Sequence, residues 1–163
     1  MKYLESQSRV LSRKELQVKI RKLQKDGKKV VFTNGCFDLI HTGHTSLFKR
    51  AKSLGDILVV AINSDSSLSY IKGSKRPLIG EKDRAELIIS LRFVDYVVIF
   101  NEETPREILS ELRPDILVKG GDYELSEIIG KEYVKEVYRV PLLKGKSTTS
   151  LIGLILDRYG SRG

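Results

Sequence analysis

Apolar and polar positions divide the chain into two alternating kinds of segment. Short apolar runs, rich in β-branched residues and too short for helices, predict five strands. They lie at residues 30–32, 56–63, 95–100, 115–118 and 136–143. Stretches with apolar residues at helical spacing predict the helices between them, at about residues 12–26, 43–54, 85–91, 104–112 and 147–155. This order predicts an α/β fold: a doubly wound, Rossmann-like, five-stranded parallel sheet with helices on both faces.

Local signals refine this outline. Ser12 and Glu15 form a capping box at the start of the first helix, and Thr104, Pro105 and Glu107 predict a second capped start. Gly55 is expected to close the helix that begins at 43. We expect residues 64–79 to form a long polar loop and residues 128–134 a weak helix. The length of 163 residues fits one domain, 1–163, with an N-terminal helix at about 12–26, a core at 28–158, and residues 1–11 as a tail or edge segment.

The stretch at residues 30–44 combines strand, turn and helix start. Both histidines of the chain, His41 and His44, lie at its end. The predicted helix begins at the carboxyl end of a strand, where its free N–H groups and dipole favour an anion such as phosphate. Two imidazoles there can donate hydrogen bonds to phosphate oxygens. The residues leave other interpretations open: His41 and His44 as a loop residue and a helix cap, or a metal site with Cys36 and Asp38, whose spacing matches no known pattern.

Four predicted loops leave the carboxyl ends of strands and therefore converge on one edge of the sheet. They are residues 33–43, 64–79, 119–123 and 144–149. In the second loop, Lys72, Lys75 and Arg76 are either surface charges or phosphate ligands. In the last, Ser147 is either a plain N-cap or part of a phosphate site. A Walker phosphate loop is excluded there, because Val140 stands where its first glycine is required.

Composition narrows the class of partner. The formal charge of +8 favours anionic ligands, but few aromatic residues are interleaved with the charges, so we expect no nucleic-acid partner. No apolar run of about 18 residues is present, so we expect no membrane span. A single cysteine, Cys36, excludes an internal disulfide and fits a reducing cytoplasm, and the first residues lack the apolar centre of a secretion signal.

Residues 35–38 and 41–44, read together, resemble the nucleotidyltransferase superfamily that carries a His-x-Gly-His signature. Within it, four stretches resemble the D-glycero-β-D-manno-heptose 1-phosphate adenylyltransferases, over about residues 12–155. They are residues 32–38, 63–65, 118–123 and 147–149. The resemblance implies an enzyme that transfers AMP from ATP to a heptose 1-phosphate and releases pyrophosphate. It argues against CTP as donor, because the Arg-Thr-Glu-Gly lead of the cytidylyltransferases is missing before Ser147.

The resemblance also assigns roles. His41, His44, Lys72 and Arg84 are expected to be catalytic, and Lys75 and Arg76 to bind the acceptor. The nucleotide is expected to be bound by Thr33, Asn34, Gly35, Phe37, Asp38, Gly43, Gly120, Gly121, Asp122, Ser147, Thr148 and Thr149. Mg²⁺ is expected to bridge the phosphates of ATP without a protein cage, so no residue is assigned as a metal ligand. Many relatives are dimers, and apolar residues between 85 and 100 offer a seam for a homodimer.

Two other interpretations remain at this point. The first is a nucleotidyltransferase that acts on another acceptor, such as a polyol, sugar or pantetheine phosphate. The second is a module that binds nucleotide or nucleic acid without turnover.

Overall fold

A computed structural model describes residues 9–121, 124–141, 143, 145 and 147–160 of the chain. The predicted five-stranded parallel sheet is confirmed, with the strand order β3-β2-β1-β4-β5. The strands are β1 (Val30–Gly35), β2 (Ile57–Asn63), β3 (Tyr96–Phe100), β4 (Ile116–Gly120) and β5 (Glu136–Val140). Before the first helix, Val10 pairs with Val97, so the chain extends the sheet beside β3. For residues 9–11 this agrees with the tail or edge segment expected at residues 1–11, and residues 1–8 lie outside the described residues.

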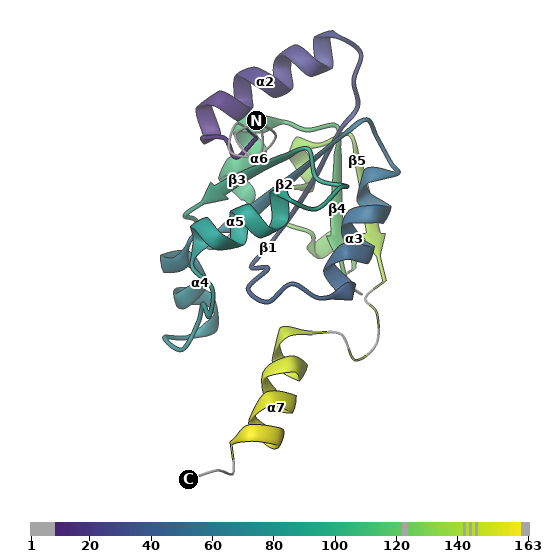
Figure 1. Cartoon of the computed structure of the whole chain (residues 1–163). Helices are drawn as coiled ribbons and strands as arrows, with labels where there is room; N and C mark the ends of the chain where they lie inside the picture. Colours follow the sequence, from purple (N-terminus) through teal and green to yellow (C-terminus); the bar gives the residue numbers. More distant parts are fainter. Residues whose placement is uncertain (1–8, 122–123, 142, 144, 146, 161–163) are drawn as a thin grey trace.

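Helices cover both faces of the sheet, as the alternation of segments predicts (Figure 1). The α-helices are α2 (Arg13–Lys25), α3 (Thr42–Lys52), α4 (Asp65–Lys72), α5 (Glu81–Ile89), α6 (Arg106–Leu112) and α7 (Thr148–Tyr159). Two short 3₁₀ turns follow β4, η1 (Leu125–Glu127) and η2 (Lys131–Tyr133). Helices α3 and α5 pack on one face, and α2 and α6 pack on the other. The predicted capping box of Ser12 and Glu15 is confirmed at the start of α2.

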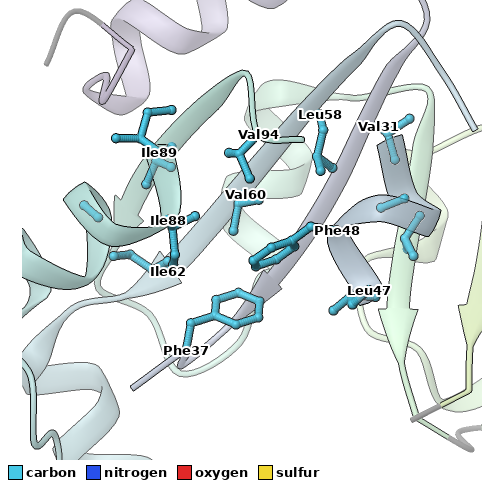
Figure 2. Packing of buried hydrophobic residues seen from close by; sticks show 14 of the residues in the cluster. Val31, Phe37, Leu47, Phe48, Leu58, Val60, Ile62, Ile88, Ile89 and Val94 are labelled. Atoms are coloured by element: carbon cyan, nitrogen blue, oxygen red, sulfur yellow. The ribbon is translucent and has the colours of Figure 1, made fainter. Parts of the chain in front are cut away.

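The two hydrophobic cores follow from the alternation of side chains along each strand. In β1, Val31 points toward α3 and α5, whereas Val30 and Phe32 point toward α2 and α6. Figure 2 shows the first core, where Phe48 of α3 lies close to Phe37 from the loop after β1. All of these side chains are buried. The loop that carries the predicted site is therefore anchored in a core rather than only at the surface.

The long polar loop expected at residues 64–79 is wrong in its first half, which forms α4. Ser64 caps this helix by accepting a hydrogen bond from the Ser67 N–H at 3.3 Å, and Asp65 lies in its first turn. Serine-rich composition is common to loops and to helix starts, so composition misled the prediction. Only residues 73–80 connect α4 to α5.

Three smaller expectations also need correction. Residues 128–134 do not form one helix, because Gly130 has φ +88° and separates η1 from η2. Helix α6 is capped by Pro105 without a side-chain hydrogen bond, so the capping box of Thr104 and Glu107 is wrong. Helix α3 ends at Lys52 with Ser53 as its C-cap, two residues before Gly55.

Two surfaces bear on the expected homodimer. Most apolar residues between 85 and 100 lie in the chain's own cores, although the side chain of Leu87 remains 47% exposed. The seam expected there is therefore largely used within one chain. Helix α7 extends away from the sheet (Figure 1), and none of its residues is buried. Its exposed apolar side chains include Leu154, Ile155 and Leu156.

Candidate active site

Two hollows open where β1 and β4 end side by side. These strands are neighbours, but the chain leaves β1 toward β2 and leaves β4 toward β5, so this is the switch point where such sheets bind ligands. The histidine pocket, about 320 Å³, is lined by Asn34, Gly35, Cys36, Phe37, His44, Leu47, Lys72, Arg76, Gly120, Thr148 and Thr149. The lysine pocket, about 230 Å³, is lined by Asn34, Glu103, Thr104, Pro105, Lys119, Glu127, Ile128 and Ile129. Asn34 lies between them and lines both.

The two histidines are stacked, with ring centroids 3.7 Å apart, but they have different tasks. His41 is the N-cap of α3, and its Nδ1 accepts a hydrogen bond from the Gly43 N–H at 3.1 Å. His44 lines the histidine pocket. Burial, reinforced by the nearby His41, lowers the pKa of His44 to about 4, so its imidazole is neutral at pH 7. His44 can therefore offer a neutral N–H donor to a phosphate oxygen.

The turn after β1 holds His44 in place. Phe37 has φ +47°, and its ring meets the His44 ring edge-on at a centroid distance of 5.1 Å. Gly35 allows this approach, since a Cβ at that position would lie 2.9 Å from the Phe37 ring. Both residues line the histidine pocket, and their role in nucleotide binding stays a prediction. Burial raises the pKa of the neighbouring Cys36 thiol, which is therefore a poor nucleophile.

The basic residues predicted on the segment after β2 do not all reach the pocket. Lys72, the last residue of α4, and Arg76 line it, whereas Lys75 does not. Arg76 donates from Nε to the buried carboxylate of Asp38 at 2.5 Å. The same carboxylate accepts hydrogen bonds from the N–H groups of Leu78 and Ile79. Asp38 therefore anchors the segment that carries Arg76, and its contacts are with protein groups.

Arg84 lies behind the pocket and does not line it. Its side chain is fully buried, and it donates to the Asp65 carboxylate at 2.8 Å, the Cys36 carbonyl at 2.7 Å and the Ile79 carbonyl at 2.9 Å. These bonds join the turn after β1 to α4 and to the segment before α5. The guanidinium positions walls of the histidine pocket, and a direct contact with substrate remains only a prediction.

Some of the other residues predicted to bind the nucleotide line the histidine pocket, and others do not. Thr148 and Thr149 in the first turn of α7 line the histidine pocket, as does Gly120 at the end of β4. Ser147 is the N-cap of α7, and its Oγ accepts a hydrogen bond from the Ser150 N–H at 3.0 Å. The remaining assignments lie outside the pocket lining: Thr33 and Gly43 are buried, and the N–H of Gly121 bonds the Val140 carbonyl. Asp122 lies outside the described residues.

Lys119 lies in the stretch 118–123 that carried the resemblance, but it was assigned no role there. Its Nζ donates to the Asn34 side-chain oxygen at 2.6 Å, in the wall between the two pockets. Burial lowers the pKa of Lys119 to about 8. The sequence signal was present, because a lysine at the end of an apolar strand that points into a ligand crevice is costly to bury. Only the fold, however, shows that it faces Asn34.

Within the described residues, no group of three or more His, Cys, Asp and Glu side chains is arranged to hold a metal ion. No helix among the described residues combines the length and the apolar character that a membrane crossing needs.

Comparison with known proteins decides the family. The cytidylyltransferase-like family model matches residues 32–154. The chain belongs to this family. It is therefore a nucleotidyltransferase, and the matched residues include both pockets.

Similar proteins and structures agree with this assignment. The chain is 48% identical over 160 residues to the bifunctional protein HldE of Syntrophotalea carbinolica, covering 96% of the chain and 33% of that protein. It is 54% identical over 127 residues to HldE of Helicobacter pylori strain 26695, covering 78% of the chain and 28% of that protein. The chain thus spans about a third of the length of these curated relatives.

Two solved structures show the same fold. The crystal structure of the lipopolysaccharide core biosynthesis protein from Thermoplasma volcanium superposes with a TM-score of 0.62 at 30% identity, over 72% of this chain and all of that one. Pantoate–β-alanine ligase from Francisella tularensis superposes with a TM-score of 0.61 at 16% identity, over 83% of this chain and 68% of that one, and supports the fold alone.

Proposed function

We propose that the chain transfers AMP from ATP to D-glycero-β-D-manno-heptose 1-phosphate, giving ADP-heptose and pyrophosphate for lipopolysaccharide core precursors. The observation that carries the proposal is the histidine pocket. It brings His44, Lys72, Arg76 and the first turn of α7 around one hollow at the switch point of the sheet. The choice of a heptose acceptor rests on the resemblance of the four stretches, and a role in lipopolysaccharide precursors is supported by the name of the lipopolysaccharide core biosynthesis protein.

The reaction is an in-line substitution at the α-phosphorus of ATP. An oxygen of the acceptor phosphate forms the new P–O bond, and the bond between the α-phosphorus and its bridging oxygen breaks, so that pyrophosphate leaves with the electron pair. No covalent intermediate with the protein is needed. Catalysis then consists of positioning the reactants and stabilising charge on the phosphates.

The residues of the histidine pocket divide these tasks. The neutral His44 imidazole donates a hydrogen bond to a phosphate oxygen, and Lys72 balances charge of the triphosphate. Arg76, predicted from the resemblance to bind the acceptor, also lines this pocket, and its charge is shared with Asp38. Thr148 and Thr149 offer hydroxyl and backbone N–H groups at the start of α7. Mg²⁺ bound to ATP supplies further charge neutralisation. We place the reaction in the cytoplasm, where ATP is available.

Pyrophosphate release tests this proposal directly. Purified protein with Mg²⁺ and heptose 1-phosphate should release pyrophosphate with ATP and at least about tenfold more slowly with CTP, the discrimination expected from roughly 1.4 kcal/mol. A reaction without acceptor is the control for simple hydrolysis. Equal rates with CTP would reject the choice of donor. Release only with glycerol, glucose or pantetheine phosphate would keep the nucleotidyltransferase and replace the acceptor.

A further inference from the structure

The lysine pocket is not used by the mechanism above, and its shape suits a small ligand. Its volume, about 230 Å³, is below the roughly 300–1,000 Å³ of pockets for drug-sized ligands. Pro105, Ile128 and Ile129 give it apolar walls, and Ile128 is buried. An apolar wall with a few polar groups is the usual form of a site that orients one small molecule. A single sugar ring is an occupant of suitable size.

The inner end of this pocket is cationic and adjoins the histidine pocket. Lys119 and Asn34 both line the lysine pocket, and Asn34 also lines the histidine pocket. The ammonium group of Lys119 reaches Asn34 at 2.6 Å and is largely removed from water. An anionic group bound here would lie next to the phosphates of a nucleotide in the histidine pocket. A phosphate is the group that the proposed reaction needs at this place.

Two carboxylates mark the outer part of the same pocket. Glu103 comes from the segment between β3 and α6, Glu127 from η1, and both residues are exposed. Among the described residues, neither carboxylate has a hydrogen-bond or ion-pair partner. Nearby glutamates differ, since Glu102 pairs with Arg13 at 2.5 Å and Glu132 pairs with Arg106. Glu103 and Glu127 are therefore available to a ligand.

We propose, resting on the proposed function, that the lysine pocket binds the sugar of the acceptor and that Glu103 and Glu127 determine its specificity. Lys119 and Asn34 hold the phosphate end, and the two carboxylates accept hydrogen bonds from sugar hydroxyl groups at the far end. A carboxylate is a strong acceptor for an O–H donor. It repels a second phosphate. The pocket thus selects an uncharged polyhydroxylated ring with one phosphate, and rejects the same sugar with a further phosphate at its far end.

Other ligands fit this arrangement less well. A metal ion would meet two carboxylates, but also the Lys119 cation at the inner end. A dicarboxylate or bisphosphate would satisfy Lys119 and place its second charge against Glu103 or Glu127. The adenine base fits the apolar walls, but it leaves Lys119 without an anion. Among these ligands, a monophosphate with an uncharged, hydroxyl-bearing body, such as a sugar monophosphate, matches the cation, the apolar walls and the carboxylates together.

Steady-state kinetics of Glu103→Gln, Glu127→Gln and the double variant test the proposal. Pyrophosphate release is measured with heptose 1-phosphate and with the same heptose carrying a second phosphate on its far hydroxyl. Each single variant should raise the KM for heptose 1-phosphate about fivefold to tenfold, through loss of a charge-assisted hydrogen bond. The KM for ATP should stay within about twofold, because the histidine pocket is untouched. The double variant should reduce discrimination against the bisphosphate by about tenfold or more.

The matched control is Glu124→Gln, which removes an exposed carboxylate beside η1 that does not line the pocket. It should leave both KM values unchanged. Unchanged acceptor KM and unchanged discrimination in the double variant would overturn the proposal while leaving the proposed function intact. A rise in the KM for ATP instead would identify the pocket as a nucleotide subsite and also overturn it. A wild-type protein that releases no pyrophosphate with any sugar 1-phosphate would overturn both proposals.

Discussion

The histidine pocket and the lysine pocket open at the same end of β1 and share Asn34, yet their charges differ. Among its described lining residues, the histidine pocket carries two cations, Lys72 and Arg76, and no carboxylate. The lysine pocket has Glu103 and Glu127 around Lys119. The first suits a polyanion such as a triphosphate, and the second suits one phosphate on an uncharged body. Asn34, at the end of β1, lines both pockets, so the proposed nucleotide and acceptor sites are neighbours that differ in the charges around them.

The largest expected effect comes from removing the donor in the histidine pocket. His44→Ala should lower kcat by about 10²–10³-fold, as loss of one preorganised donor to phosphate typically does. The KM for heptose 1-phosphate should change little, because His44 does not line the lysine pocket. Stopped pyrophosphate-release assays measure both constants. A higher KM for heptose 1-phosphate with an unchanged kcat would contradict separate roles for the two pockets.

His41→Asn is the companion to that experiment. Asparagine is a good N-cap, so the start of α3 should be preserved while the imidazole is lost. A variant as stable and as active as wild type would limit His41 to capping. A kcat loss as large as that of His44→Ala, at unchanged stability, would make both histidines catalytic.

Arg84 is expected to affect only the histidine pocket, by holding the walls of that pocket in place. Arg84→Met leaves the Cys36 and Ile79 carbonyls without a donor, so the free energy of unfolding should fall by about 2–4 kcal/mol. Urea denaturation measures this loss. Arg84→Lys, which keeps the charge, should recover part of both stability and rate. Full stability with abolished turnover in Arg84→Lys would instead indicate direct contact with substrate.

Lys119 should give the lysine pocket a pH dependence in the alkaline range. Burial lowers its pKa to about 8, so the cation that we propose for the acceptor phosphate is present below pH 8 and lost above it. The acceptor KM should therefore rise about tenfold from pH 8 to pH 9.5, while the ATP KM should not follow. In Lys119→Arg the rise should disappear, because arginine stays charged. An unchanged rise in this variant would assign the pH dependence to another group.

The smallest expected effect concerns the cap of α7. Ser147→Ala removes the hydrogen bond to the Ser150 N–H, which stabilises a helix start by about 1 kcal/mol. Because no residue of α7 is buried, the urea midpoint should not change, whereas ATP binding by calorimetry should weaken about threefold to fivefold. Ser90→Ala, at the exposed C-cap of α5, is the control. A shifted urea midpoint would mean that α7 packs on the body.

The order of elements was largely predictable because it depends on local patterns. The β-branched runs located all five strands, and the capping box of Ser12 and Glu15 located the start of α2. The errors came from segments whose composition fits two structures. The serines before Lys72 form a capped helix rather than a loop, and Gly130 divides the segment predicted as a helix.

From the sequence, residues could be assigned to the site only where they belong to a recognisable motif. The resemblance of the motifs predicted catalytic roles for His44 and Lys72, acceptor binding for Arg76 and nucleotide binding for Thr148 and Thr149, and the structure brings all five to the histidine pocket. The same motifs could not distinguish residues that line a pocket from residues that support it. Asp38, Arg84 and Ser147 hold backbone or other protein groups. That distinction depends on burial and hydrogen-bond partners.

The sequence by itself therefore determined the fold class and the family signature, and it predicted an anion site at the start of α3, because periodicity and short motifs are properties of neighbouring residues. Only the tertiary structure decided that Lys119 meets Asn34, 85 positions away, and that Glu103 and Glu127 line one pocket. The parallel sheet sets these contacts, since its strand order places β4 beside β1 across a long crossover. The pattern of charges along the sequence does not predict the strand order. The lysine pocket can therefore be identified only in the folded protein.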